Sequence, residues 1–399
     1  MMKMKVRRAV LQHYFRLHEH FSLSFRRNSV RFGAWREFSQ DSYRMTNRDV
    51  FAFKGITTVL AFALALLLSA CAQRGTPIAP EPEETLLDHP TSALPEKFSQ
   101  TGLYRDPVLE IPSDRVMAYE VRYALYSDDN DKSRYLFLPP GGKIANHNAQ
   151  EWEFPEGTLF FKTFYLTAMG NRAAPKRKIE TRVLQHRSNG WQVGVYQWNT
   201  AGDEAFLTNG SEIRLPFQLP LGNYVYTIPS RLMCLACHQP QKDFVIGFEM
   251  IRLSGVLDEN GGEQLRRLAD RDIFTQPLAD TKIEIPGPEV EREAIGYLHG
   301  NCANCHNPHS PVFSTTALDL RFTWLKENTV NVRPEKFATN DSTQVRIKPG
   351  APEESLLFQL LARTFDDGAQ FMPPLGTSRT DTVGIDLVRR WILSLGTAD

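Results

Sequence analysis

Residues 234–238 of this chain read CLACH, and the same pattern, CxxCH, returns at residues 302–306 as CANCH. The chain has five cysteines, and four of them belong to these two motifs. The fifth, Cys71, lies far upstream, so no pair of cysteines is left over for a structural disulfide. The two motifs therefore account for the thiols, and the interpretation of fold and function starts from them.

The CxxCH pattern suits the covalent attachment of haem. Two cysteines three residues apart lie about one helical turn from each other, so both sulfurs can form thioether bonds to one porphyrin. The histidine that follows supplies an imidazole nitrogen to the iron. The sequence predicts two covalently attached haems of the c type, and their attachment and ligand residues are Cys234, Cys237 and His238 for the first and Cys302, Cys305 and His306 for the second.

Zinc sites and thiol oxidoreductases also use closely spaced cysteines. A four-cysteine zinc ribbon places its two pairs roughly 15–20 residues apart, whereas 64 residues separate Cys237 from Cys302. A thioredoxin-like motif needs a βαβ context, which neither site shows. Haem is therefore the favoured cofactor.

The segment upstream of the first motif, residues 100–228, is predicted to be rich in β-strands. Tyr119, Val121 and Tyr123 alternate with smaller or polar residues, which is typical of a half-buried strand. An Asn-Gly pair at 189–190 separates two apolar runs and predicts a hairpin. We expect a β-rich N-terminal domain folded as a sandwich or a partial barrel. The acidic run 128–131 lacks the ligand spacing of a calcium loop and is interpreted as a solvated turn.

Downstream of the second motif, Met372 stands in the stretch FMPPLG, between two segments with leucines at helical spacing. With CANCH, this pattern resembles a class I cytochrome c domain over residues 290–399. The resemblance implies a mainly α-helical cytochrome c domain behind the β-rich domain, in a multidomain chain. It also implies that His306 is the proximal ligand and Met372 the distal one.

For the first haem-binding segment, residues 229–289, the distal ligand stays open. Met250 is the nearest candidate, and His147 or His186 could reach from the β-rich region. The site could also have an open coordination position. Two histidines that flank the second motif, His299 and His309, are expected at the surface or the rim rather than on a metal.

The N-terminal 71 residues are predicted to be a leader for export. Residues 56–70 form an apolar run of 15 residues, shorter than the roughly 20 needed to span a bilayer. The run ends in Leu-Ser-Ala-Cys at 68–71, which resembles the bacterial lipobox. That resemblance implies a lipid on Cys71 as the mature N-terminus, and Ala72 after it favours the outer membrane.

Two further segments are assigned near the N-terminus. Met45 stands where an ordinary signal would begin, so residues 1–44 are interpreted as over-annotated upstream sequence. Residues 72–99 are rich in proline and glutamate and are predicted to be an extended tether.

The order of segments resembles a group of bacterial diheme c-type cytochrome lipoproteins. This resemblance adds architecture more than function. The two haem sites and the exported leader favour an electron carrier over an enzyme, in the cell envelope and facing the periplasm. It would accept electrons from a donor dehydrogenase or cytochrome and pass them to another carrier, so its expected partners are redox proteins. Lys plus Arg and Asp plus Glu both total 46, which makes a nucleic-acid partner unexpected.

Two other functions stay open. A diheme peroxidase would need an open coordination site at the first haem, where peroxide would bind. A binding module would use the β-rich region to recognise a ligand while the haems sense redox state.

Overall fold

The protein was analysed as a computed structural model, which describes residues 84–167, 176–219, 222–258, 260–278, 280–335, 343–368 and 370–396. The described residues belong to one compact unit that extends from 80 to 399. The predicted leader 1–71, with the lipidation site Cys71, lies outside the described residues, as does the predicted tether up to residue 83. For residues 84–99 the prediction of an extended tether is wrong, because Leu86, Leu87 and Phe98 are buried in one core cluster. Among the described residues, none of the helices has the length and apolar character needed to cross a bilayer.

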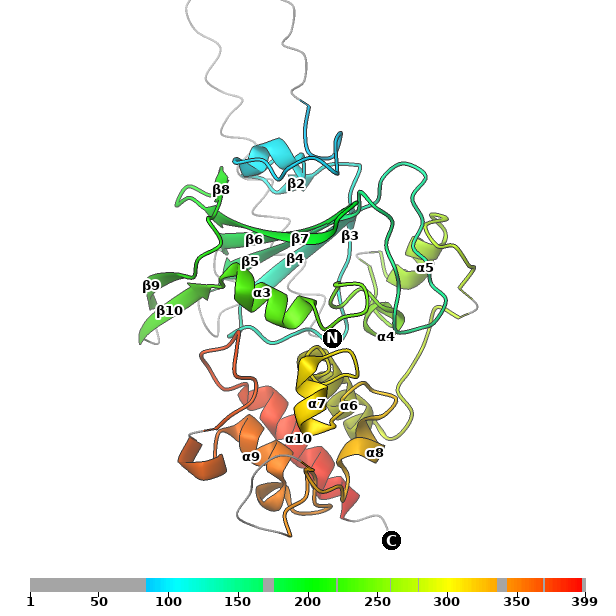
Figure 1. Cartoon of the computed structure of the whole chain (residues 1–399), viewed down its shortest axis with the longest axis vertical. Helices are drawn as coiled ribbons and strands as arrows, with labels where there is room; N and C mark the ends of the chain where they lie inside the picture. Colours follow the sequence, from blue (N-terminus) through cyan, green and yellow to red (C-terminus); the bar gives the residue numbers. More distant parts are fainter. Residues whose placement is uncertain are drawn as a thin grey trace, which may run out of the picture. The chain divides into compact units, whose positions relative to one another are not determined.

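A six-stranded antiparallel sheet forms the centre of the β-rich region (Figure 1). Its strands follow one another in chain order, so each pairs only with its sequence neighbours. They are β3 (Met117–Ala118), β4 (Asp131–Phe137), β5 (Leu159–Leu166), β6 (Arg177–Arg187), β7 (Gly190–Trp198) and β8 (Ala205–Leu207). The hairpin predicted at the Asn-Gly pair is confirmed, because Arg187 pairs with Gly190 where β6 turns into β7.

Two smaller antiparallel pairs accompany this sheet. They are β1 (Tyr104–Asp106) with β2 (Ile111–Pro112), and β9 (Ile213–Leu219) with β10 (Gly222–Ile228). The expected sandwich or partial barrel is therefore wrong. In the described part of the chain the main sheet is open, because β3 and β8 are its edges and do not pair with each other.

The two faces of the sheet pack against different parts of the chain. On β5, Phe161 points to a cluster built with the N-terminal segment, which includes Phe98 of the short 3-10 helix η1 (Phe98–Thr101). The neighbouring residue Phe160 points to the opposite face, where the cluster includes Cys234 of the first motif. This alternation follows from the period of two in a strand. The sheet thus forms a wall against which the first motif packs.

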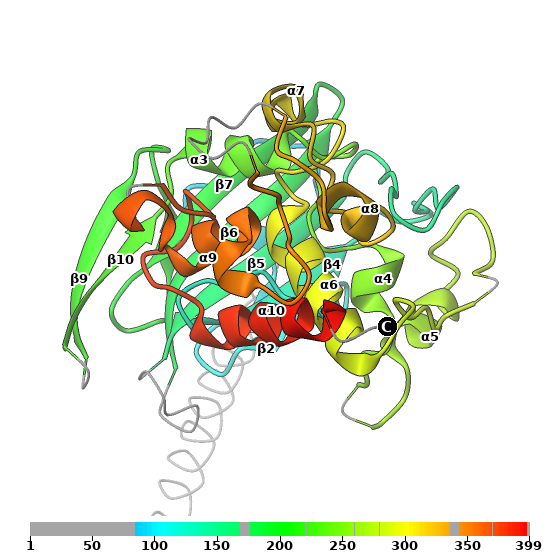
Figure 2. The ribbon, with the colours of Figure 1, turned by 90° about the horizontal axis from the view of Figure 1, so that it is seen from below.

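Eight α-helices lie in the described residues, most of them short. They are α3 (Arg231–His238), α4 (Met250–Leu253), α5 (Gln264–Ala269), α6 (Glu289–Cys302), α7 (Pro311–Thr316), α8 (Leu325–Thr329), α9 (Leu356–Ala362) and α10 (Thr382–Leu395), with 3-10 turns η2 (Pro352–Glu354) and η3 (Phe365–Gly368). The two longest, α6 and α10, pack against each other (Figure 2). A Cβ atom at Gly384 of α10 would lie 2.2 Å from the ring of Tyr297 on α6, so this close packing requires glycine.

The predicted mainly α-helical cytochrome c domain is wrong. Fewer than half of the described residues from 289 to 396 are α-helical, and the described structure as a whole is β-rich. The reason lies in the connections. Helix α7 ends where Ala317 takes a left-handed φ of 47°, and after α8 the chain turns into an isolated parallel bridge between Val330 and Ile347.

One buried carboxylate joins the sheet region to the loop that precedes α10. Asp128 accepts hydrogen bonds from the backbone N–H groups of Ser378 and Arg379, each at 3.0 Å, and from the Ser378 hydroxyl at 2.6 Å. Tyr224 of β10 donates a further bond at 3.1 Å. The expectation of a solvated turn is therefore wrong for Asp128, which is 9% exposed, because its charge is needed to satisfy these donors.

We expect Asp128→Asn to lower the free energy of unfolding by about 2–3 kcal/mol, because an amide cannot accept from all four donors. Urea denaturation would measure the loss. Asp129→Asn is the matched control, since Asp129 also has a positive φ but is exposed. Equal stability of the two variants would contradict the assigned role.

Candidate functional site

The first CxxCH motif lies on α3, on the inner face of the sheet. The helix begins after Ser230, whose side chain accepts a hydrogen bond from the backbone N–H of Met233 at 3.3 Å. Serine is one of the residues preferred at this N-cap position. Cys234 is buried in the cluster that includes Phe160 of the sheet, and Cys237 follows one turn later, partly exposed. Both thiols therefore lie on one short, anchored helix.

His238 closes the first motif with its ring fixed in one orientation. Its Nδ1 lies 2.7 Å from the carbonyl oxygen of Phe244, which leaves Nε2 free of this bond. Phe244 can present its carbonyl this way because it takes a left-handed φ of 64°. Burial lowers the pKa of His238 to about 4, although the Phe244 carbonyl acts in the opposite direction. The imidazole is therefore neutral at pH 7, the form that binds a metal.

The second motif lies at the carboxyl end of α6. Cys302 is the last residue of the helix, and its carbonyl accepts hydrogen bonds from the N–H groups of Cys305 and His306 at 3.1 and 2.9 Å. His306 is 8% exposed. Burial, with a smaller effect of Arg346, lowers its pKa to about 4. Within the described residues its buried Nδ1 has no hydrogen-bond partner.

The two motifs, 64 residues apart in sequence, meet in space. The side chains of Cys237 and Cys305 interact, and this interaction lowers the pKa of Cys237 to about 7 and raises that of Cys305. The amide of Gln241 joins the same two segments, because it donates to the carbonyls of Cys237 at 3.1 Å and Asn304 at 2.6 Å. Nothing in the sequence spacing indicated this contact or the role of Gln241.

A buried arginine also connects the second motif to the sheet side. Arg252 on α4 donates to the carbonyl of His299 and to the side chain of Asn304, both at 3.0 Å. It also forms an ion pair with Glu249 at 2.8 Å. Burial raises the pKa of Glu249, but Arg252 and His299 together hold it below its usual value.

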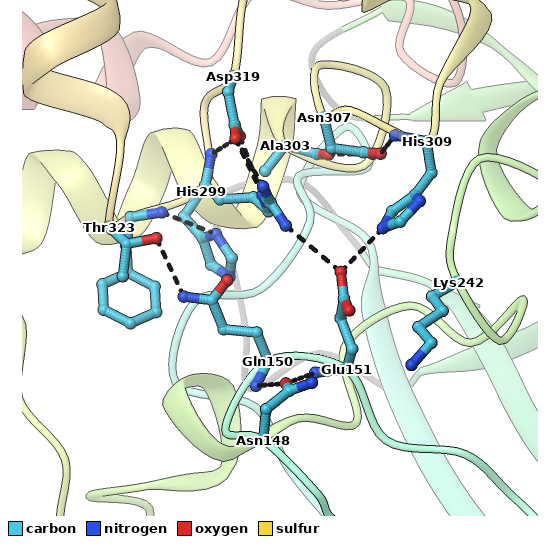
Figure 3. A network of polar contacts seen from close by, with 12 residues as sticks. Asn148, Gln150, Glu151, Lys242, His299, Ala303, Asn307, His309, Asp319 and Thr323 are labelled. Atoms are coloured by element: carbon cyan, nitrogen blue, oxygen red, sulfur yellow. Dashed lines mark hydrogen bonds and ion pairs between the residues drawn. The ribbon is translucent and has the colours of Figure 1, made fainter.

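The two flanking histidines differ in environment. His299 is 3% exposed and its Nε2 lies 2.7 Å from Glu249, so the expectation that it lies at the surface or rim is wrong. Its burial follows from its place on the packed face of α6. The side chain of His309 is 44% exposed and pairs with Glu151 at 2.9 Å, as Figure 3 shows. The expected rim position of His309 is confirmed.

A pocket of about 50 Å³ lies beside these residues. Its lining includes Gln241, which follows the first motif, and Asn304 of the second motif. It also includes Lys242, Asn307 and Glu151, which are labelled in Figure 3. This volume accommodates one or a few water molecules rather than a large organic ligand. The pocket can therefore hold polar solvent between the two motifs.

The candidate distal ligands lie in different environments. Met372 is half-buried in the loop between α9 and α10, where its N–H donates to the carbonyl of Leu360 at 3.0 Å. Met250 is buried in the same cluster as Cys234, which keeps it a candidate for the first motif. His186 is stacked on Trp191, with ring centres 4.6 Å apart, and His147 is exposed. The distal assignments stay predictions.

No protein-family model, curated protein or solved structure matches this chain.

The residues present fit a covalently bound haem at each motif. Each motif offers two thiols and an imidazole that is neutral at pH 7, which are the groups that attach a haem of the c type and bind its iron. Among the described residues, no group of three or more His, Cys, Asp or Glu side chains is arranged to hold a metal ion. A haem does not need such a group, since its iron takes only one or two ligands from the protein.

The thiol contact gives a test of the site geometry. When haem-free protein is treated with diamide, we expect a disulfide between Cys237 and Cys305, because a thiolate with a pKa of about 7 attacks readily. Peptide mass mapping without reduction would identify the bond, and Cys305→Ser is the control that must remove it. If only bonds within each motif formed, the contact would be refuted.

Proposed function

We propose that this protein is an exported c-type cytochrome with two covalently bound haems, which transfers electrons between a donor dehydrogenase or cytochrome and another redox carrier. The contact between Cys237 and Cys305 is the observation that carries the proposal. Two attachment sites whose cysteines interact would place the two haems close together, in one redox unit. When bound, each haem supplies an iron that gains and loses one electron.

The histidines support this proposal through their environment. The Phe244 carbonyl holds the Nδ1 proton of His238, so the Nε2 lone pair is oriented for a metal. Burial lowers the pKa of His306 to about 4, so its imidazole is also neutral at pH 7. We propose these two residues as the proximal ligands. Met372 is proposed as the distal ligand of the second haem, since a soft thioether favours reduced iron.

The proposed location is the outer membrane, with the folded part facing the periplasm. It depends on the lipobox-like stretch 68–71 and on a lipid at Cys71. Redox proteins of the periplasm are the proposed partners. Cys71→Ser should move the protein from the membrane fraction to the soluble fraction of fractionated cells. Unchanged membrane association would contradict the anchor.

The main test is the haem count of protein matured in a host that attaches c-type haem. A pyridine haemochrome assay and the intact mass should give two haems per chain, and Cys237→Ala and Cys305→Ala should each lose one. Met372→Ala should keep both haems, but one reduction potential should fall. Colourless wild-type protein would refute the proposed function, and an unchanged redox titration of Met372→Ala would refute that ligand alone.

A further inference from the structure

Three positively charged side chains form a row across the central strands of the sheet. Arg134 on β4 is directly opposite Lys162 on β5, which is directly opposite Arg182 on β6. Like charges in directly opposed positions of a sheet repel and destabilise it. Such a row is unexpected unless the charges have a counterpart.

The row lies on the face of the sheet that carries the first motif. Lys162 lies between Phe160 and Phe164 on the same face of β5, because residues two apart in a strand point the same way. Both phenylalanines belong to the cluster that includes Cys234. Helix α3 packs against β7 on this side, as Figure 1 shows. Because these phenylalanines pack in one cluster with Cys234, the Lys162 side chain lies on the face that contacts the first motif.

The two arginines have carboxylate partners, but the lysines on this face do not. Arg134 pairs with Glu120 and Arg182 with Glu180, both at 2.6 Å. Lys132, two residues before Arg134 on β4, donates to the carbonyl of Leu125 at 2.7 Å. The side chain of Lys162 has no hydrogen bond or ion pair with another described residue. Its ammonium lies 5.2 Å from the ring centre of Phe164.

The surroundings make these uncompensated charges costly. Burial, reinforced by neighbouring cations such as Arg134, lowers the pKa of Lys162 well below its usual value. Burial likewise lowers the pKa of Lys132 to about 7. Both side chains nevertheless keep some accessible surface. This face therefore has two more basic side chains than carboxylates, and neither lysine has a carboxylate partner.

We propose that Lys162 and Lys132 bind the two carboxylate side chains of the first haem, so that the sheet forms one wall of that haem's site. This inference rests on the proposed function and extends it to the role of the β-rich region. The two carboxylates of a haem match in number the two lysines that have no carboxylate partner. The anionic end of a group bonded to Cys234 and Cys237 would be held by side chains of β4 and β5.

The test uses Lys162→Met in protein that also carries Cys305→Ala, which keeps only the first haem. Lys178→Met is the matched control, because Lys178 is also buried in the sheet but lies against Trp198 on the opposite face. Urea denaturation of haem-free protein and redox titration of haem-loaded protein would both be measured. Lys162→Gln serves as a second variant if the methionine variant does not fold.

Lys162→Met should raise the free energy of unfolding of the haem-free protein, since it removes a repelling charge. It should lower the reduction potential of the first haem, because a nearby positive charge favours the reduced iron. Lys178→Met should destabilise the haem-free protein and leave the potential unchanged. A first haem whose potential is unaffected by either Lys162 variant would overturn the inference but not the proposed function, whereas absence of haem from the wild type would overturn both.

Discussion

The buried guanidinium of Arg252 is the constraint on which the arrangement of the two motifs depends. It is 4% exposed, so its charge must be compensated where it lies. Glu249 supplies the counter-charge, and the carbonyl of His299 and the side chain of Asn304 accept hydrogen bonds from its Nη2 group. Because Glu249 and Arg252 lie at α4, whereas His299 lies on α6 and Asn304 in the second motif, satisfying one buried charge fixes α4 against the second motif.

Local features of the fold could be predicted from the sequence where a short pattern determines them. The Asn-Gly pair determines the hairpin between β6 and β7, and Ser230 caps α3 through its own side chain. The final helix α10 was also expected from its apolar spacing. Its buried residues are Gly384, Val388, Trp391 and Ile392, whereas the apolar side chain of Val383 is 79% exposed. Periodicity located this helix but did not give the limits of its buried face.

Features that depend on contacts between distant segments could not be predicted. Asp128 lies in an acidic run that is typical of a solvated turn, and only the donors of Ser378 and Arg379, about 250 residues later, explain its burial. The same holds for His299, whose partner Glu249 lies on another helix. The prediction of a mainly helical C-terminal domain was wrong for a related reason. Leucine spacing identifies helices, but it does not give the length or conformation of the segments that connect them. The sequence identified the cysteines and histidines of the candidate site, but it did not indicate that the two motifs lie next to each other in the fold.

The burial of Cys234 has a consequence for biosynthesis. Its side chain is enclosed between α3 and the aromatic residues of the sheet, with 5% of its surface accessible. An enzyme that modifies a sulfur must approach it with both its own active site and the incoming group, which the finished fold does not allow at this position. Any covalent attachment to Cys234 must therefore take place before the chain has finished folding. The modification then precedes the packing of α3 against the sheet.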